Sequence, residues 1–294
     1  MTLRRIIIHA GAHKTGTSLV QKYLRDRQEM CHAAGIWTLP RSDANIFIGW
    51  GSRHRVKKNI GGLVSAIEAA EAEGASYYIA SHENTLGKPF INNNSGLYPK
   101  SRRVRYLRSA LGDRPLRVVY YIREQAGFLE SYYLQTIHEG GRCSFRDFMS
   151  HIDIDNISWK PVYETLCANF GVENVVVKSF EEEIAKGQSA YLENFLRSSV
   201  EDDLSPFGKF KYHPVRNPSI GWLGLRLSLF LNAFASAPEK RRQVRNFMQK
   251  HFSNRRFARP RLLTEDEKYI LSVLYGEENR EIVERSASAV EKIR

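Results

Sequence analysis

The stretch "RRIIIHAGAHKTGTSLVQKYL", residues 4–24, constrains the fold of this chain more than any other feature. Its apolar, β-branched start predicts a short buried strand, and residues 16–29 predict a helix. The apolar stripe of that helix consists of Leu19, Val20, Tyr23 and Leu24. A strand, a glycine-containing turn and a helix present backbone N–H groups and a positive dipole end to an anion. We therefore expect the loop to bind a phosphate-like group.

Strands and helices alternate over the first 180 residues. Further strands are predicted at 76–81, 116–123 and 174–180, and further helices at 59–74, 101–113 and 124–139. This alternation is typical of an α/β fold with a parallel sheet flanked by helices. After residue 180 the pattern predicts only helices, at 188–199, 219–235, 238–252 and 264–292. We expect one domain, residues 1–294, with an α/β core at about 1–180 and a mainly helical portion at 181–294.

Charge and cysteine content restrict the partners and the compartment. The net charge is +12, which indicates an anionic partner such as a phosphorylated cofactor, an acidic glycan, a lipid headgroup or a nucleic acid. The three cysteines, Cys31, Cys143 and Cys167, are few, odd in number and far apart, so a disulfide framework or zinc site is disfavoured. With no apolar run of membrane-spanning length and no signal-peptide pattern, we expect a cytoplasmic protein, at most peripheral to the inner face of the membrane.

The loop at residues 9–18 departs from the pattern of a nucleoside triphosphate site, G-x-x-x-x-G-K-[ST]. Gly11 and Gly16 have the required spacing, but Thr17 stands where the lysine belongs, and Lys14 lies inside the turn. No predicted strand ends in the aspartate that would bind magnesium. A magnesium–nucleotide site is therefore disfavoured, although a nucleotide kinase-like enzyme remains an alternative.

The same loop resembles the 5′-phosphosulfate loop of sulfotransferases that use 3′-phosphoadenosine 5′-phosphosulfate (PAPS). Their pattern is roughly H-x-G-x-x-K-[ST]-G-T-[ST]. The residues that match it here are His9, Gly11, Lys14, Thr15, Gly16, Thr17 and Ser18. The resemblance implies a P-loop-like sulfotransferase fold, PAPS as co-substrate without a metal, and an acceptor of the carbohydrate type. His13, beside the lysine, is expected to line the site.

The second signature of that family is an arginine at a strand end with a serine eight residues later. Arg123 and Ser131 match it and would hold the 3′-phosphate. The family also has a proline and a further arginine in this motif, where the chain has Gln125 and Phe128. Arg216 in "HPVRNPSIG" is either a further contact to the 3′-phosphate or an ordinary loop arginine.

The base that accepts the proton of the acceptor hydroxyl should follow a strand beside the loop. "YYIASHENT" offers His82 and Glu83. Glu83 resembles the glutamate that commonly serves as the base in glycan sulfotransferases, so we favour it over His82. Lys14 would stabilise the charge that develops on the departing phosphate oxygen. Each histidine also fits a structural role, and Glu83 also fits a salt bridge.

Two stretches of the chain are strongly basic. Residues 240–261 contain nine Lys or Arg and no Asp or Glu, and residues 100–108 contain five. They form either a solvated surface or a landing surface for an anionic glycan or membrane leaflet. Phe247, Phe252 and Phe257 interleave with the basic residues, which also suits nucleic acid, but nothing else resembles a nucleic-acid module.

The sequence as a whole predicts a PAPS-dependent sulfotransferase. It would transfer a sulfuryl group to a hydroxyl of a carbohydrate or glycolipid and release 3′,5′-adenosine bisphosphate. The alternatives are a nucleotide kinase-like enzyme, which would need magnesium, and a basic binding protein that has the fold without catalysis.

Overall fold

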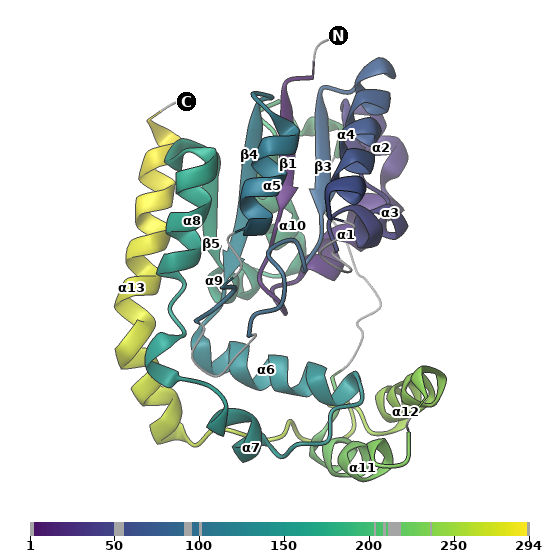
Figure 1. Ribbon diagram of the computed structural model, residues 1–294, viewed down its shortest axis with the longest axis vertical. Coiled ribbons are helices and arrows are strands. Elements are labelled where there is room, and N and C mark those ends of the chain that lie inside the picture. Colours follow the sequence, from purple (N-terminus) through teal and green to yellow (C-terminus); the bar gives the residue numbers. More distant parts are fainter. Residues whose placement is uncertain are drawn as a thin grey trace.

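The computed structural model describes residues 3–49, 56–90, 96–99, 102–202, 204–207, 210, 219–235 and 237–292. Its centre is a parallel five-stranded sheet in the order β2-β3-β1-β4-β5, with helices on both faces (Figure 1). The strands are β1 (Arg5–His9), β2 (Ile36–Thr38), β3 (Tyr77–Ser81), β4 (Leu116–Ile122) and β5 (Val175–Ser179). The predicted α/β fold with a helical C-terminal portion is confirmed.

The central strands are buried on both faces because their side chains are almost all apolar. In β1, Ile6 and Ile8 point into one core cluster and Ile7 into the other, and all three are at most 1% exposed. In register, Ile6 pairs with Tyr78 of β3 and with Leu116 of β4. A continuous apolar run is what a parallel strand covered by two layers of helix requires.

The helices follow most of the predicted ranges. They are α1 (Thr17–Asp26), α2 (Gln28–Ala33), α3 (Arg41–Phe47), α4 (Val56–Ala72), α5 (Arg102–Leu111), α6 (Gln125–His138), α7 (Phe145–Ser150), α8 (Lys160–Phe170), α9 (Phe180–Ala185), α10 (Gln188–Ser199), α11 (Trp222–Asn232), α12 (Pro238–His251) and α13 (Glu265–Glu291). The helix predicted at 16–29 is shorter than expected. It ends at Asp26, and the chain starts a new helix at Gln28.

The long helix α13 covers the edge of the sheet beside β5 (Figure 1). The Ser286 hydroxyl accepts a hydrogen bond from the Val177 N–H (2.7 Å) and donates one to the Val175 carbonyl (2.8 Å). These contacts engage backbone groups that an edge strand would otherwise expose. No described helix has the length and apolarity needed to cross a membrane.

Helices α6, α11 and α12 lie beyond the carboxyl ends of the strands (Figure 1). Asn232 at the end of α11 donates to the carbonyls of Ile137 and Gly141, both at 2.8 Å, which attaches α11 to the end of α6. Ligands of open parallel sheets bind outside the carboxyl ends of the strands. This end of the sheet also holds the loop after β1.

Candidate functional site

The loop between β1 and α1 has two residues in the left-handed backbone region. Gly16 (φ 83°) is the N-cap of α1, and Lys14 has φ 67°. A left-handed conformation at a residue other than glycine costs about 1–3 kcal/mol and persists where the surroundings hold it. The Tyr191 hydroxyl donates to the Thr15 carbonyl (2.7 Å) and would lie 3.0 Å from a Cβ at Gly16. Tyr191, on α10, therefore supports the loop in this conformation.

Some side chains of this loop are buried in the protein and others are exposed to solvent. The Thr15 hydroxyl is buried and donates to the Ala12 carbonyl (2.6 Å), and the buried Thr17 hydroxyl has no hydrogen-bond partner among the described residues. Lys14 and Ser18 are exposed. No side chain caps α1, and its first turn contains no acidic residue, so its N-terminal N–H groups and dipole are open to an anion. These donors fit a phosphate- or sulfate-like group.

The pKa of Lys14 reflects burial and three charged neighbours. Desolvation by the surrounding protein lowers the pKa of the Lys14 ammonium from its usual value, although the side chain remains accessible to solvent. The carboxylates of Glu83 and Glu139 act in the opposite direction, and Arg123 lowers the pKa of Lys14 further. Lys14 and Glu83 therefore lie near enough for the carboxylate to influence the ammonium group.

Arg123 follows β4 directly and connects the two sequence motifs. Its Nη1 donates to the Ser131 hydroxyl and to the Lys14 carbonyl, both at 2.9 Å. Ser131 lies on α6, which begins two residues after Arg123. Arg123 therefore joins the strand end, the following helix and the loop after β1 through hydrogen bonds.

Two residues at the end of β5 were missed by the sequence analysis. Glu181 accepts hydrogen bonds from Arg123 Nε and from the Glu124 backbone N–H, both at 3.2 Å. The guanidinium also lies over the Phe180 ring, 5.1 Å from its centroid. Burial raises the pKa of the Glu181 carboxyl and Arg123 opposes this shift. Glu181 therefore orients Arg123 but also places a negative charge beside it. In the sequence, Glu181 could have been recognised as a candidate site residue by its position directly after a predicted strand.

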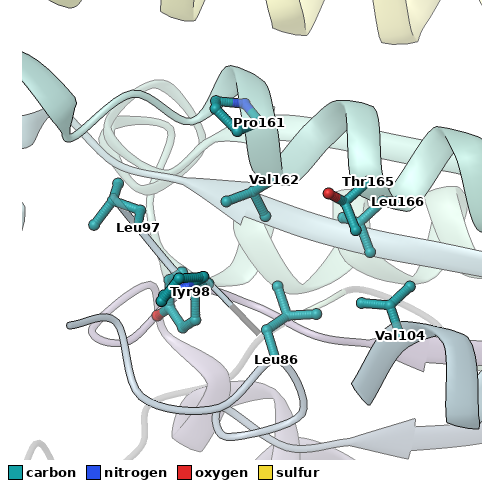
Figure 2. A pocket seen from close by; sticks show the side chains of 9 residues that line it. Leu86, Leu97, Tyr98, Val104, Pro161, Val162, Thr165 and Leu166 are labelled. Atoms are coloured by element: carbon teal, nitrogen blue, oxygen red, sulfur yellow. The ribbon is translucent and has the colours of Figure 1, made fainter. Parts of the chain in front are cut away.

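His13 is fixed by Tyr98. The Tyr98 hydroxyl oxygen accepts from the His13 N–H (2.8 Å) and lies 2.7 Å from Nδ1 of its ring. Burial lowers the pKa of His13 to about 4, so the ring is neutral near pH 7. Tyr98 also lines a cavity of about 210 Å³ whose other walls are mainly leucine, valine and proline (Figure 2). An apolar cavity of this kind does not supply the anion site.

His82 and Glu83 follow β3 but differ in their surroundings. The Asn84 N–H donates to Nδ1 of His82 (2.9 Å), which leaves the ring proton on Nε2, 2.8 Å from Asn45 Oδ1. Both ring nitrogens are thus engaged within the protein, and burial lowers the pKa of His82 to about 4. Glu83 is half-buried and acts on the pKa of Lys14. Of these two residues, His82 is therefore bonded within the protein, whereas Glu83 acts on the Lys14 ammonium.

The structure does not inform every predicted contact. Arg216 lies in residues 211–218, outside the described part of the chain. In the described ranges, no group of three or more His, Cys, Asp or Glu side chains is placed to hold a metal ion. Of the basic stretch 100–108, Arg103 is half-buried and donates to the Asn84 carbonyl (3.2 Å), so this arginine supports the loop after β3.

Comparison with known proteins adds little. No protein-family model and no curated protein match the chain. A solved structure that matches is a sulfotransferase from Alicyclobacillus acidocaldarius, with 15% sequence identity and a TM-score of 0.41, over 83% of this chain and 95% of that one. Similarity at this level assigns no activity, which has to be argued from the residues of the chain itself.

Acid should destabilise the protein through its buried neutral histidines. Burial lowers the pKa of His9 to about 3 and those of three others to about 4, namely His13, His82 and His138. In the unfolded chain a histidine titrates near 6.5. Between about pH 6.5 and 4 the unfolded state binds more protons, so the free energy of unfolding falls as the pH is lowered. Each such histidine adds about 1.4 kcal/mol per pH unit to that slope.

Urea unfolding at a series of pH values measures this slope. His82→Gln is the matched variant, because the glutamine amide, like the histidine ring, offers both a hydrogen-bond donor and an acceptor but does not titrate. Its free energy of unfolding should depend on pH less steeply than that of the wild type, by about one proton in this window. Identical slopes for the two proteins would contradict the account of His82.

Proposed function

We propose that the chain is a PAPS-dependent sulfotransferase that acts on a hydroxyl of a carbohydrate or glycolipid and releases 3′,5′-adenosine bisphosphate. The observation that carries the proposal is the position of Arg123, which bonds to both Ser131 and the Lys14 carbonyl. Residues 109 positions apart in the chain are thereby brought together, which supports a shared role in binding an anion. The donor carries two anionic groups, a 5′-phosphosulfate and a 3′-phosphate, and two cationic groups are available for them.

The donor would be held at both of these groups. Lys14, the exposed Ser18 and the N–H groups at the start of α1 would bind the 5′-phosphosulfate. Arg123 and Ser131 would bind the 3′-phosphate. Thr15 and Gly16 act mainly through the backbone, because the hydroxyl of Thr15 is already bonded inside the loop.

The chemistry requires a base for the acceptor and a cation for the leaving group. The acceptor oxygen forms a bond to sulfur while the bond from sulfur to the phosphate oxygen breaks. Glu83 would take the proton of the acceptor hydroxyl. Lys14 would stabilise the negative charge that grows on the departing phosphate oxygen. The influence of Glu83 on the pKa of Lys14 supports both roles within one site.

Transfer of labelled sulfate from PAPS to fractions of cell-envelope extract tests the proposal. The wild-type protein should label a glycan or glycolipid fraction, and Lys14→Met should label it far less. A parallel reaction with γ-labelled ATP and magnesium tests the kinase-like alternative. Label transferred from ATP and not from PAPS, in every fraction, would contradict the proposal, whereas label transferred from neither would favour a non-catalytic binding protein.

Arg123→Ala should weaken binding of 3′,5′-adenosine bisphosphate about 10- to 150-fold, since a hydrogen bond to a charged group contributes about 1.5–3 kcal/mol. Titration calorimetry should show a much smaller loss for adenosine 5′-phosphosulfate, which has no 3′-phosphate. Glu181→Gln is the companion variant: it keeps an acceptor for Arg123 Nε but removes a negative charge, so the bisphosphate should bind more tightly. An equal loss of both ligands in Arg123→Ala would mean that this arginine does not recognise the 3′-phosphate.

A further inference from the structure

Helix α11 exposes a stripe of aromatic side chains. Trp222, Phe230 and Phe234 are 45%, 63% and 68% exposed. With the exposed Arg226 they are spaced four residues apart, so they follow one stripe along α11 and the turn after it, in which Phe234 lies. The rings of Phe230 and Phe234 contact each other, with centroids 5.3 Å apart. Large exposed aromatics that cluster on one helix face indicate an interaction surface.

The neighbouring helix supplies positive charge. Helix α12 packs against α11 and contains the first part of the stretch 240–261, which has nine Lys or Arg and no Asp or Glu. The exposed cationic residues of this stretch are Lys240, Arg242, Lys250, Arg255, Arg256, Arg259 and Arg261. Phe247 on α12 is also 51% exposed. We call the exposed residues of 222–261 the α11–α12 face.

A second exposed apolar patch gives a comparison within the same molecule. It lies on α13 and consists of Tyr269, Ile270, Val273 and Leu274, each at least 48% exposed. Its exposed charged neighbours include Glu265, Asp266, Glu277 and Glu281. Exposed apolar area is therefore common to both helices, whereas beside α11 the exposed charged residues are basic apart from Glu239 at the start of α12.

We propose that the α11–α12 face binds the surface of an anionic lipid bilayer, with its aromatic side chains at the headgroup boundary and its lysines and arginines on lipid phosphates. Helices that lie on a membrane combine Trp and Phe on one side with Lys and Arg on the other. Each basic residue near an anionic leaflet contributes to the attraction. An aromatic stripe beside a basic helix matches that chemistry, and the acidic surroundings of the α13 patch do not.

The basic segment also approaches the candidate active site. Arg259 lowers the pKa of Arg123, and Arg245 lowers that of His138, which Lys14 also affects. Helix α11 is also attached to the end of α6, the helix that carries Ser131. A membrane bound at the α11–α12 face would therefore present a glycolipid hydroxyl at the same end of the sheet as the site. This consequence for the acceptor rests on the proposed function, whereas lipid binding itself does not.

Vesicle flotation tests the proposal with the full chain and two kinds of vesicle, pure phosphatidylcholine or phosphatidylcholine mixed with phosphatidylglycerol. The protein should float with the anionic vesicles and not with the neutral ones, and added salt should weaken binding. The double variant Phe230→Ser/Phe234→Ser should lose at least about 10-fold in partitioning, because apolar area no longer leaves water. Lys240→Glu/Arg242→Glu should reduce binding to the anionic vesicles as well.

The matched control is Tyr269→Ser/Val273→Ser, which removes similar exposed apolar area from α13 and should float as the wild type does. Each variant should keep thermal stabilisation by 3′,5′-adenosine bisphosphate, so a failure of lipid binding is distinguishable from a failure of donor binding. Absence of flotation with anionic vesicles would overturn the proposal, as would equal losses in the α11 and α13 variants. Binding of a single-stranded oligonucleotide, with no vesicle binding, would assign the face to nucleic acid instead.

Discussion

Glu83→Gln should lower the turnover of sulfate transfer by at least about 10², the usual lower bound for loss of a general base. Glutamine keeps the size of the side chain and much of its hydrogen bonding but cannot accept the proton of the acceptor. The melting temperature and the affinity for the bisphosphate should stay close to those of the wild type. Steady-state transfer to an acceptor found in the extract assay, together with thermal unfolding, measures all three quantities.

His82→Gln distinguishes the two neighbouring candidates. Since Nδ1 and Nε2 of His82 are both engaged by asparagine groups, this variant should change stability more than turnover. Normal turnover in Glu83→Gln with a large loss in His82→Gln would make the histidine the base. Normal turnover in both would place the base elsewhere.

Lys14→Met should reduce turnover by about 10²–10³, in the range found when one preorganised donor to a developing charge is removed. Methionine is unbranched and similar in length, so the backbone at this position meets the same steric demands as it does with lysine. Affinity for the bisphosphate should fall less than turnover, because the charge on the bridging oxygen develops only during transfer. Transfer rates and calorimetry on the same protein separate the two effects.

Lys88→Met provides the control for Lys14→Met. Lys88 is also an exposed lysine in a loop, and its removal lowers the net charge by the same amount. Its turnover should match that of the wild type. An equal loss in both variants would mean that general positive charge, and not the position of Lys14, supports transfer.

The sequence was sufficient to predict the parts of the fold that depend on local pattern. The β-branched run of β1, the loop after it and the amphipathic stripe of α1 all lie within residues 4–26, so each could be inferred from its neighbours in the chain. The strand before Arg123 was predicted in the same way. The resemblance to sulfotransferases implied that Arg123 and Ser131 contact the same phosphate; the bond that Arg123 donates to the Ser131 hydroxyl became visible only in the structure.

Features that depend on contacts between distant segments could not be predicted. Strand β2 has only three residues, and its pairing with β3 is what defines it. Tyr191 supports the phosphate loop from 176 residues away, and Glu181 meets Arg123 only because β4 and β5 are adjacent in the sheet. The inward orientation of the Thr15 hydroxyl likewise follows from the folded loop, since the pattern alone places a donor there without a direction.

Thermal unfolding in the presence of 3′,5′-adenosine bisphosphate, with a chelator and no magnesium, tests the central claim most directly. At about 100 times its dissociation constant the bisphosphate should add roughly 2.7 kcal/mol to the free energy of unfolding. Magnesium should not be needed, because Lys14, Arg123 and backbone N–H groups neutralise the phosphates. Equal or greater stabilisation by magnesium–ATP, with none from the bisphosphate, would contradict the assignment of this site to a sulfotransferase donor.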